Sequence, residues 1–309
     1  MSKLNISVSP HIHSGKSTTR IMLDVIIALL PTSVAGVILF GWRALALIAV
    51  CVIAAVLSEF VFNLCTKKSQ SIADLSSVVT GLLLALNLST SVPLWQAAVG
   101  SVFAIVVVKC IFGGIGQNFA NPAITARIFM LVAFGSLAKS AFPEGVDAVS
   151  GATPLASLLS GAEPSLMDLF LGKCGGAIGE VCALALLVGG IYLIVRRVIT
   201  WHTPVSFIGA VFVLSLIFEK GDALAALAWV LSGGLIIGAV FMATDYATSP
   251  TTRTGKVIFG VGCALITALI RFFGNYPEGV SFAILFMNIL TPFIDKLTVR
   301  KPFGGAINE

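Results

Sequence analysis

The chain has 309 residues, of which 57% are hydrophobic and only 11% are charged. A soluble domain carries about a quarter charged residues, so this composition excludes a water-soluble globular protein and predicts an integral membrane protein. The net charge of +5 would suit nucleic acid in a soluble protein. Here we expect the positive charges in short loops beside the membrane and exclude nucleic acid as a partner.

The first 20 residues are polar and no cleavage pattern follows the first apolar stretch, so we expect a cytoplasmic tail and no signal peptide. SGKST (14–18) resembles the end of a P-loop, but Pro10 stands where that motif needs its first glycine. His11 and His13 have no further ligand nearby, which favours a polar tail over a metal site. The six cysteines form no C-x-x-C pair and are expected to be structural thiols.

Ten apolar segments follow, and most are long enough to cross a bilayer as helices. In chain order they cover 21–40, 44–64, 75–88, 94–112, 122–137, 175–195, 204–218, 224–243, 257–273 and 280–294. With the N-terminus placed in the cytoplasm, 14 of the 19 Lys and Arg residues fall on that side. This asymmetry favours an even number of crossings with both termini inside. The expected fold class is therefore an all-α integral membrane protein of about ten transmembrane helices.

The longest polar interval separates five segments from five. We divide the chain into an N-terminal tail (1–20), a first five-helix half (21–137), an outer-face loop (138–174), a second five-helix half (175–295) and a C-terminal tail (296–309). Five crossings per half invert the second half relative to the first, as in many transporters. A faint echo between NFANPAITARIF (118–129) and DYATSPTTRTGKVIF (245–259) agrees with a repeat. These stretches, FGGIG (112–116) and the short third segment predict broken helices.

The polar interval contains DAVSGAT, residues 147–153. By composition it is an ordinary loop, because Ser, Gly and Thr are common turn residues. The combination also allows a functional interpretation. Gly151 lets the backbone approach a ligand closely, Thr153 offers a hydroxyl that can be esterified, and Asp147 can help to hold a phosphate-bound metal while the ester forms.

DAVSGAT fits D-x-x-S/T-G-A-T, the acceptor pattern for covalent FMN in bacterial redox proteins. With SPHIHSG (9–15), GGIGQNFANPA (113–123) and GAVFMATDYATSP (238–250), it makes the chain resemble one family nearly end to end. That family comprises the D subunit of Rnf ion-translocating oxidoreductases and the B subunit of the sodium-pumping NADH:quinone reductase. The resemblance implies FMN joined to Thr153 through a phosphoester by a flavin transferase. It places the acceptor site on the preceding residues Asp147, Ser150, Gly151 and Ala152.

A second stretch, FGGIGQNFANPA (112–123), is either a glycine-rich hinge with an Asn-Pro turn or a cofactor site. Asn118 and Asn121 are expected at the cytoplasmic ends of two segments. An asparagine amide both donates and accepts hydrogen bonds, which suits the edge of a flavin ring. The resemblance implies a noncovalent riboflavin near these asparagines.

Four acidic residues lie in or near the apolar segments: Asp24, Glu59, Asp74 and Asp245. Ionisable groups at membrane depth are usually functional. All four fall toward the cytoplasmic ends, however, where snorkelling or a helix-end hydrogen bond is the simpler explanation. Asp245 lies close to Thr244 and Thr248, which makes it the best candidate for an ion pathway.

The resemblance implies an electron-transfer subunit, in the bacterial inner membrane, of an Rnf-type complex that couples ferredoxin:NAD oxidoreduction to Na⁺ or H⁺ translocation. Its expected partners are a second covalent-FMN subunit on the outer face and the NAD- and ferredoxin-reacting subunits inside. No acid–base pair or nucleophilic triad is apparent, so no stand-alone catalysis is expected. Two alternatives stay open: a urea-transporter-like channel or transporter without flavin, and a scaffold that only anchors redox partners.

Overall fold

The computed structural model describes residues 17–135, 141–143, 153–160, 164–274 and 279–299. Within these ranges the chain is helical and contains no β-strand beyond an isolated bridge between Ala141 and Gly176. This confirms the expected all-α fold class. The described helices form two groups joined by the segment that carries two short helices.

The described part of the first half contains five α-helices, a 3₁₀ turn and a π-helix that continues α4. In chain order these are α1 (Thr18–Phe40), α2 (Trp42–Cys65), η1 (Ile72–Asp74), α3 (Ser76–Leu86), α4 (Leu94–Val102), η2 (Phe103–Cys110) and α5 (Pro122–Phe134). The side chain of Ser17 accepts a hydrogen bond from the Arg20 N–H (3.3 Å) and so caps α1. A left-handed Gly135 ends α5.

The connecting segment and the second half complete the described chain. They contain α6 (Pro154–Leu159), α7 (Leu166–Leu171), α8 (Ala183–Val195), α9 (His202–Phe218), α10 (Ala223–Leu231), α11 (Leu235–Ile237), the π-helix η5 (Gly238–Met242), α12 (Arg253–Phe273) and α13 (Val280–Thr298). The side chains of Asp222 and Thr252 accept N–H bonds at the starts of α10 and α12. Both helices therefore begin where the sequence supplies a capping side chain.

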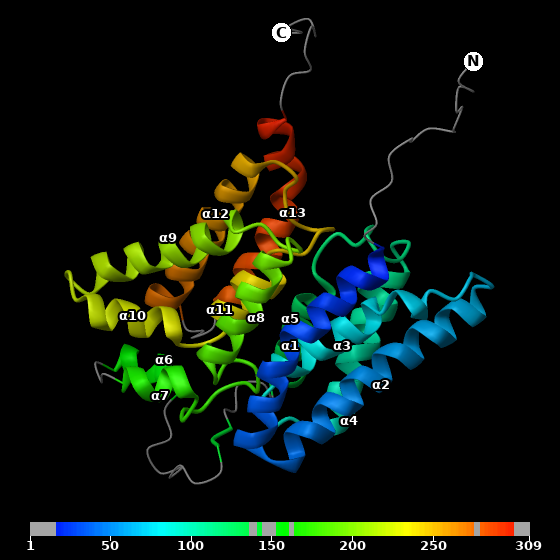
Figure 1. Ribbon diagram of the computed structural model, residues 1–309, viewed down its shortest axis with the longest axis horizontal. Helices are drawn as coiled ribbons and strands as arrows, with labels where there is room; N and C mark the ends of the chain where they lie inside the picture. The colour runs from blue at the N-terminus through cyan, green and yellow to red at the C-terminus, as the bar shows by residue number, and fades with distance from the viewer. Residues whose placement is uncertain (1–16, 136–140, 144–152, 161–163, 275–278, 300–309) are drawn as a thin grey trace, which may run out of the picture.

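The two halves lie side by side, and α1 packs against α8 between them (Figure 1). These two helices run in opposite directions. The start of α1 and the end of α13 lie at one end of the molecule, whereas α6 and α7 lie at the opposite end. We call these the α1-start end and the α6 end.

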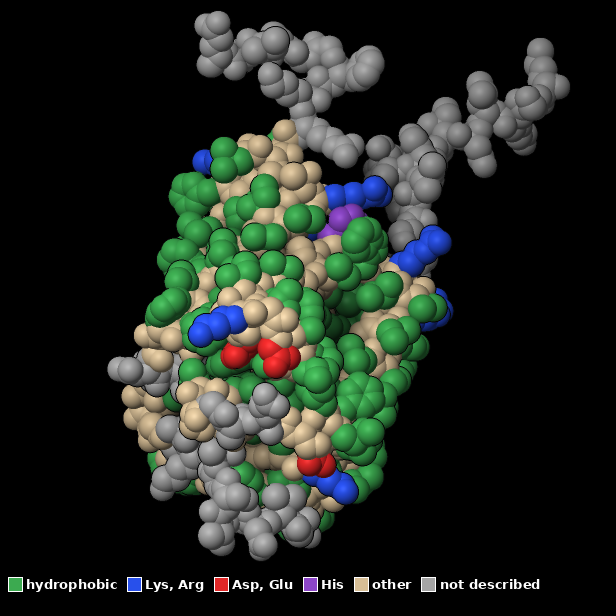
Figure 2. Space-filling view, turned by 90° about the vertical axis from the view of Figure 1, so that its left-hand side faces the viewer, with side chains coloured by type: hydrophobic (Ala, Val, Ile, Leu, Met, Phe, Trp, Pro, Cys, Tyr) green, Lys and Arg blue, Asp and Glu red, His purple; other side chains and the backbone are tan. Residues whose placement is uncertain are grey.

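Ten apolar helical segments were expected, and the described chain has four helices long and apolar enough to cross a membrane: α1, α2, α12 and α13. A fifth span is the bent pair of α10 with α11–η5, whose parts meet at 67°. Five shorter apolar helices account for the rest. Side chains on the face of α9 and α10 are largely hydrophobic (Figure 2), as suits contact with lipid.

Several boundaries differ from the expectation. The segment expected at 175–195 becomes helical only at Ala183, and the one expected at 224–243 is interrupted at Ser232–Gly234, where Gly233 has φ +68°. The expected breaks within 118–129 and 245–259 are instead irregular leads into unbroken helices. Caps explain the difference, because Asn121 and Thr252 satisfy the first free N–H groups of α5 and α12.

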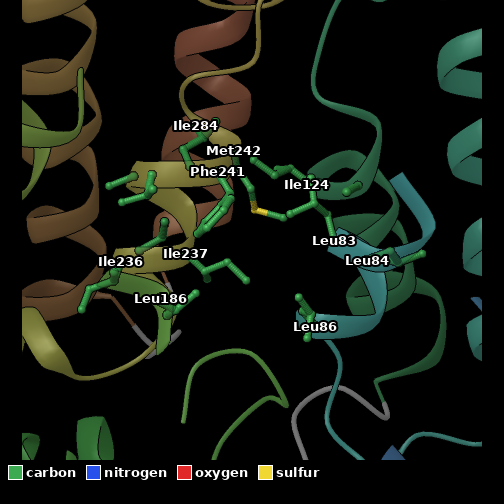
Figure 3. Close-up of a cluster of buried hydrophobic side chains, with 14 of the residues drawn as sticks. Leu83, Leu84, Leu86, Ile124, Leu186, Ile236, Ile237, Phe241, Met242 and Ile284 are labelled. Atoms are coloured by element: carbon green, nitrogen blue, oxygen red, sulfur yellow. The ribbon is translucent and has the colours of Figure 1, made fainter. Parts of the chain in front are cut away.

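Apolar side chains fill the interface between the halves (Figure 3). The first half contributes Leu83, Leu84, Leu86 and Ile124, and the second contributes Leu186, Ile236, Ile237, Phe241, Met242 and Ile284. All these side chains are buried. Where these side chains meet, the described chain is packed like the core of a globular protein.

Candidate functional site

A pocket lies between the halves at the α1-start end. Its walls come from the starts of α1, α3 and α5, the end of α8 and the segment after η5. Its lining includes polar side chains from both halves: Ser76, Thr80, Lys109, Asn118, Asn121, Thr244, Asp245 and Tyr246. The empty space, counted out into the solvent at the open mouth, is about 780 Å³.

The two stretches that echo each other in sequence meet beside this pocket. The side chain of Asn121 accepts the N–H groups of Ala123 (3.0 Å) and Ile124 (3.4 Å) and donates to the Met242 carbonyl (3.3 Å). It therefore caps α5 and joins the first half to the end of η5. Asn288 strengthens the junction: with its amide oriented to satisfy both neighbours, it accepts from the Asn121 N–H and donates to the Thr248 carbonyl, each at 3.2 Å.

Asn118 and Asp245 also line the pocket from opposite halves. Asn118 donates to the Ala120 carbonyl (3.0 Å), and Thr248 Oγ1 donates to an Asp245 carboxylate oxygen (3.1 Å). Burial raises the pKa of the Asp245 carboxyl above its ordinary value, while hydrogen bonds from Thr248, the Ala247 backbone and Asn118 act in the opposite direction. The structure thus brings Asn118, Asn121 and Asp245 together in one site.

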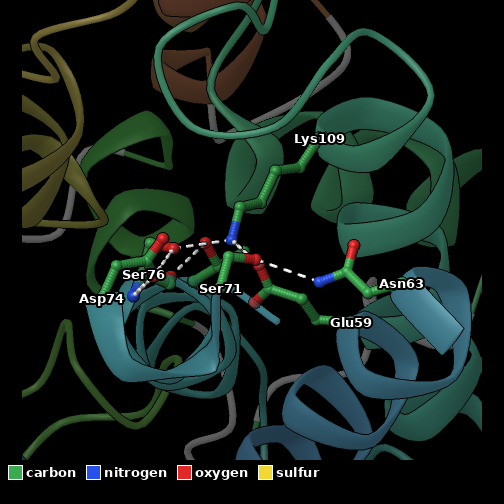
Figure 4. Close-up of polar contacts among 7 residues, drawn as sticks. Glu59, Asn63, Ser71, Asp74, Ser76 and Lys109 are labelled. Carbon is green, nitrogen blue, oxygen red and sulfur yellow. Dashed lines mark hydrogen bonds and ion pairs between the residues drawn. The ribbon is translucent and has the colours of Figure 1, made fainter. Parts of the chain in front are cut away.

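Lys109 is a pocket residue that the sequence analysis missed. Its ammonium donates to Glu59 Oε1 (2.9 Å) and Ser76 Oγ (2.6 Å), and both charged side chains are almost fully buried. Ser71 donates to the same carboxylate oxygen (2.7 Å) and accepts from Asn63 (Figure 4). The signal in the sequence was a lysine near the end of the apolar segment 94–112, which we counted among the charges on the cytoplasmic side.

A second buried ion pair joins the halves farther from the pocket. Arg127 of α5 donates to Glu180 Oε1 (3.1 Å), to Asn87 Oδ1 (2.9 Å) and to Ser281 Oγ (3.3 Å). Glu180 also lies against Gly234, at the interruption between α10 and α11. The sequence analysis missed this cluster because its members are far apart in the chain.

The remaining acidic candidates have structural partners. Asp24 accepts hydrogen bonds from Arg196 (3.2 and 3.4 Å) and from the Tyr192 hydroxyl (3.0 Å), which ties α1 to α8. Asp74 accepts the N–H of Ser76 (2.9 Å) at the start of α3. Both carboxylates therefore accept hydrogen bonds near helix ends, which is the simpler explanation given for these residues in the sequence analysis.

Thr153 is the last residue of the acceptor stretch, the one residue of that stretch that the structure describes, and it is the N-cap of α6. Its hydroxyl oxygen accepts the Ala156 N–H (3.3 Å), and the residue is half-buried. Leu155 and Leu158 of α6 are packed in a cluster with Trp229 of α10. Asp147, Ser150, Gly151 and Ala152 lie outside the described residues.

The donor set at the two sites fits flavin chemistry. The pocket combines apolar walls with amide, hydroxyl and ammonium groups, which is the composition that holds a flat aromatic cofactor in a fixed orientation. Thr153 presents a hydroxyl on a helix held by packing, so an ester formed there would be anchored to the second half. Thr153 precedes α6, which lies at the opposite end of the molecule from the start of α1, a helix that lines the pocket (Figure 1).

Comparison with known proteins agrees with the sequence resemblance. A model of the NQR2, RnfD, RnfE family matches residues 5–304. The chain is 46% identical over 312 residues to the D subunit of the Na(+)-translocating ferredoxin:NAD(+) oxidoreductase complex of Acetobacterium woodii, covering 98% of this chain and 97% of the relative. It is 40% identical over 320 residues to the D subunit of the proton-translocating ferredoxin:NAD(+) oxidoreductase complex of Clostridium ljungdahlii, covering 97% and 96%. The chain therefore belongs to the NQR2, RnfD, RnfE family.

Proposed function

We propose that this chain is the membrane electron-transfer subunit of an Rnf-type complex that couples ferredoxin:NAD oxidoreduction to Na⁺ or H⁺ translocation. Its two flavin positions are Thr153, for FMN bound through a phosphoester, and the pocket between the halves, for noncovalent riboflavin. Family membership over nearly the whole chain supports the assignment. The names of the two relatives carry different ions, so similarity alone does not select the ion.

The observation that supports the proposal is that α6, which follows Thr153, and the start of α1, which lines the pocket, lie at opposite ends of the molecule (Figure 1). A subunit that passes electrons across a membrane needs redox groups near both faces. The α1-start end would face the cytoplasm and the α6 end the outer side, in keeping with the distribution of Lys and Arg. Flavins supply one- and two-electron transfer when bound, and the protein supplies position and nearby charge.

Each described site residue has a definite task under this proposal. Thr153 supplies the ester oxygen, and its helix holds the tether against α10. Asn121 keeps the two halves in register at the pocket, and Asn118 and Asp245 provide polar groups on its wall. Apolar packing between the halves excludes water from the route between the two ends.

The proposed partners follow from membership of a multisubunit complex. A second covalent-FMN subunit would meet the α6 end, and the NAD- and ferredoxin-reacting subunits would meet the α1-start end. A flavin transferase would load Thr153 before assembly. The protein would reside in the bacterial inner membrane with both termini in the cytoplasm.

The covalent flavin is tested on a denaturing gel under ultraviolet light. The full chain is produced in a host that has the transferase, alongside Thr153→Asn. Asparagine preserves helix capping but offers no hydroxyl to esterify, so its fold should persist while the fluorescent band disappears. A wild-type chain whose peptide around Thr153 carries no added mass would refute the covalent site.

The noncovalent flavin is tested by counting flavin released from Thr153→Asn protein after denaturation. About one flavin per chain is expected from the pocket. A value near zero, with wild-type protein carrying only the covalent group, would remove the pocket flavin and leave the covalent site standing. No flavin in either protein would favour the channel or the scaffold alternative.

A further inference from the structure

Lys109 is the one lysine on the wall of the described pocket. It lies in η2, where α4 widens into a π-helix, a local distortion that is frequent at functional sites. The residue is only 3% exposed. A lysine so deeply buried within an apolar segment is stable only with charge compensation, and Glu59 supplies it.

The ion pair is arranged asymmetrically with respect to the pocket. Lys109 and Ser76 line the pocket, whereas Glu59 does not. Glu59 lies on α2. Its carboxylate accepts a hydrogen bond from Ser71, whose hydroxyl accepts one from Asn63 (Figure 4). A ligand in the pocket is therefore closer to the cation of the pair than to the anion.

We propose that Lys109 raises the midpoint potential of the flavin in this pocket and that Glu59 limits the increase. This inference rests on the proposed function of the pocket. An electron added to a neutral oxidised flavin, from the redox partners that the complex supplies, gives the flavin one negative charge when no proton follows. An ammonium in surroundings of low polarity favours that charged state, and the carboxylate behind it weakens the effect. The protein thus tunes the cofactor through two buried charges of opposite sign.

A purely structural role makes a different prediction. If the Lys109–Glu59 pair only holds α2 against η2, removing either partner lowers stability and flavin content. The midpoint potential of the flavin then shows no systematic change. The electrostatic role predicts an order. The midpoint potential should be highest in Glu59→Gln, where the cation has no counter-charge, and then fall through wild type to the double variant and to Lys109→Met.

The test is a spectroelectrochemical titration of the full chain in a Thr153→Asn background, so that the spectrum comes from the pocket flavin alone. Glu59→Gln and Lys109→Met should each change the ratio of affinities for reduced and oxidised flavin at least about tenfold, in opposite directions. For one electron, tenfold corresponds to about 59 mV. Lys109→Arg keeps the positive charge and should stay near the wild-type potential even if flavin content falls.

A matched control removes one carboxylate elsewhere. Glu219 lies after α9 and accepts a hydrogen bond from Trp229, in the cluster beneath α6. It does not line the pocket, so Glu219→Gln should leave the potential unchanged. Equal potentials in wild type, Glu59→Gln and the double variant would overturn the inference.

The outcomes separate this inference from the proposed function. If the Thr153→Asn protein holds no flavin, the pocket flavin itself is refuted, and the inference falls with it. If it holds flavin but the potentials do not follow the order, only the role of Lys109 is refuted. If Lys109→Met fails to assemble, Glu59→Gln still decides, because its potential must rise.

Discussion

The described part of the chain contains two buried ion pairs, Lys109–Glu59 and Arg127–Glu180, with similar geometry and different surroundings. Lys109–Glu59 (2.9 Å) joins two elements of one half and borders a pocket, whereas Arg127–Glu180 (3.1 Å) joins the two halves within the packed interface. Arg127 also reaches Asn87 and Ser281, so its guanidinium is held on several sides. A buried charge that is surrounded only by protein groups contributes to the stability of the fold. A buried charge on the wall of a pocket can also act on a ligand bound there.

The largest expected effect comes from breaking the pair between the halves. Glu180→Ala leaves the Arg127 guanidinium without its carboxylate in a buried site, which should destabilise the protein by about 3–5 kcal/mol. Thermal unfolding in detergent measures the change. If the loss is below about 1 kcal/mol, this pair does not hold the halves together, and the contrast with Lys109–Glu59 loses its basis.

Substitution of Gly234 tests how closely Glu180 of the Arg127–Glu180 pair is packed against the interruption between α10 and α11. A Cβ at this position would lie 2.7 Å from Glu180 Oε1, so Gly234→Ala should destabilise the protein by about 1–3 kcal/mol. Gly209 on α9 is the matched control, because a Cβ there meets nothing within 4 Å. Gly209→Ala should instead stabilise the helix by about 0.5–1 kcal/mol. Equal effects in thermal unfolding would contradict the packing argument.

Asn121 tests the junction of the halves on the pocket side. Asn121→Ala removes the cap of α5 and the bond to Met242, with an expected loss of about 0.5–2 kcal/mol and a lower content of noncovalent flavin. Asn121→Asp keeps the oxygen that caps the helix and loses the donor to Met242. The stability of Asn121→Asp should therefore fall less than that of Asn121→Ala. The amount of flavin released on denaturation then measures how far the bond to Met242 contributes to flavin binding. Full flavin content in both variants would separate the junction from the pocket.

The smallest effect is expected at the ion pair nearest to solvent. The Arg196 side chain is 42% exposed, compared with 10% for Arg127. Solvent screening limits such a pair, so Asp24→Asn should cost at most about 1 kcal/mol. High salt should reduce the difference between this variant and wild type. A loss as large as that of Glu180→Ala would show that exposure does not distinguish these pairs.

Much of the site was predictable because its signals are local. Asn118 and Asn121 were chosen from an Asn-Pro stretch between two apolar segments, and both lie on the pocket wall. Asp245 was chosen from a polar stretch of similar pattern, and the structure brings it to the same pocket. Lys109 and Asn288 were missed, because each is a single polar residue within or beside an apolar helix and finds its partners only through packing.

The sequence by itself determined that this chain is an all-α membrane protein with ten apolar helical segments, because composition and hydrophobic length depend on no distant contact. It also determined the start of α5, where the Asn121 side chain caps the N–H groups beside it. By contrast, α1 and α12 begin three and four residues before the expected positions 21 and 257, after the caps Ser17 and Thr252. Only the tertiary structure decided where the second half is interrupted and which charges are paired. Those features depend on contacts between residues that are far apart in the chain, and local sequence carries no information about such contacts.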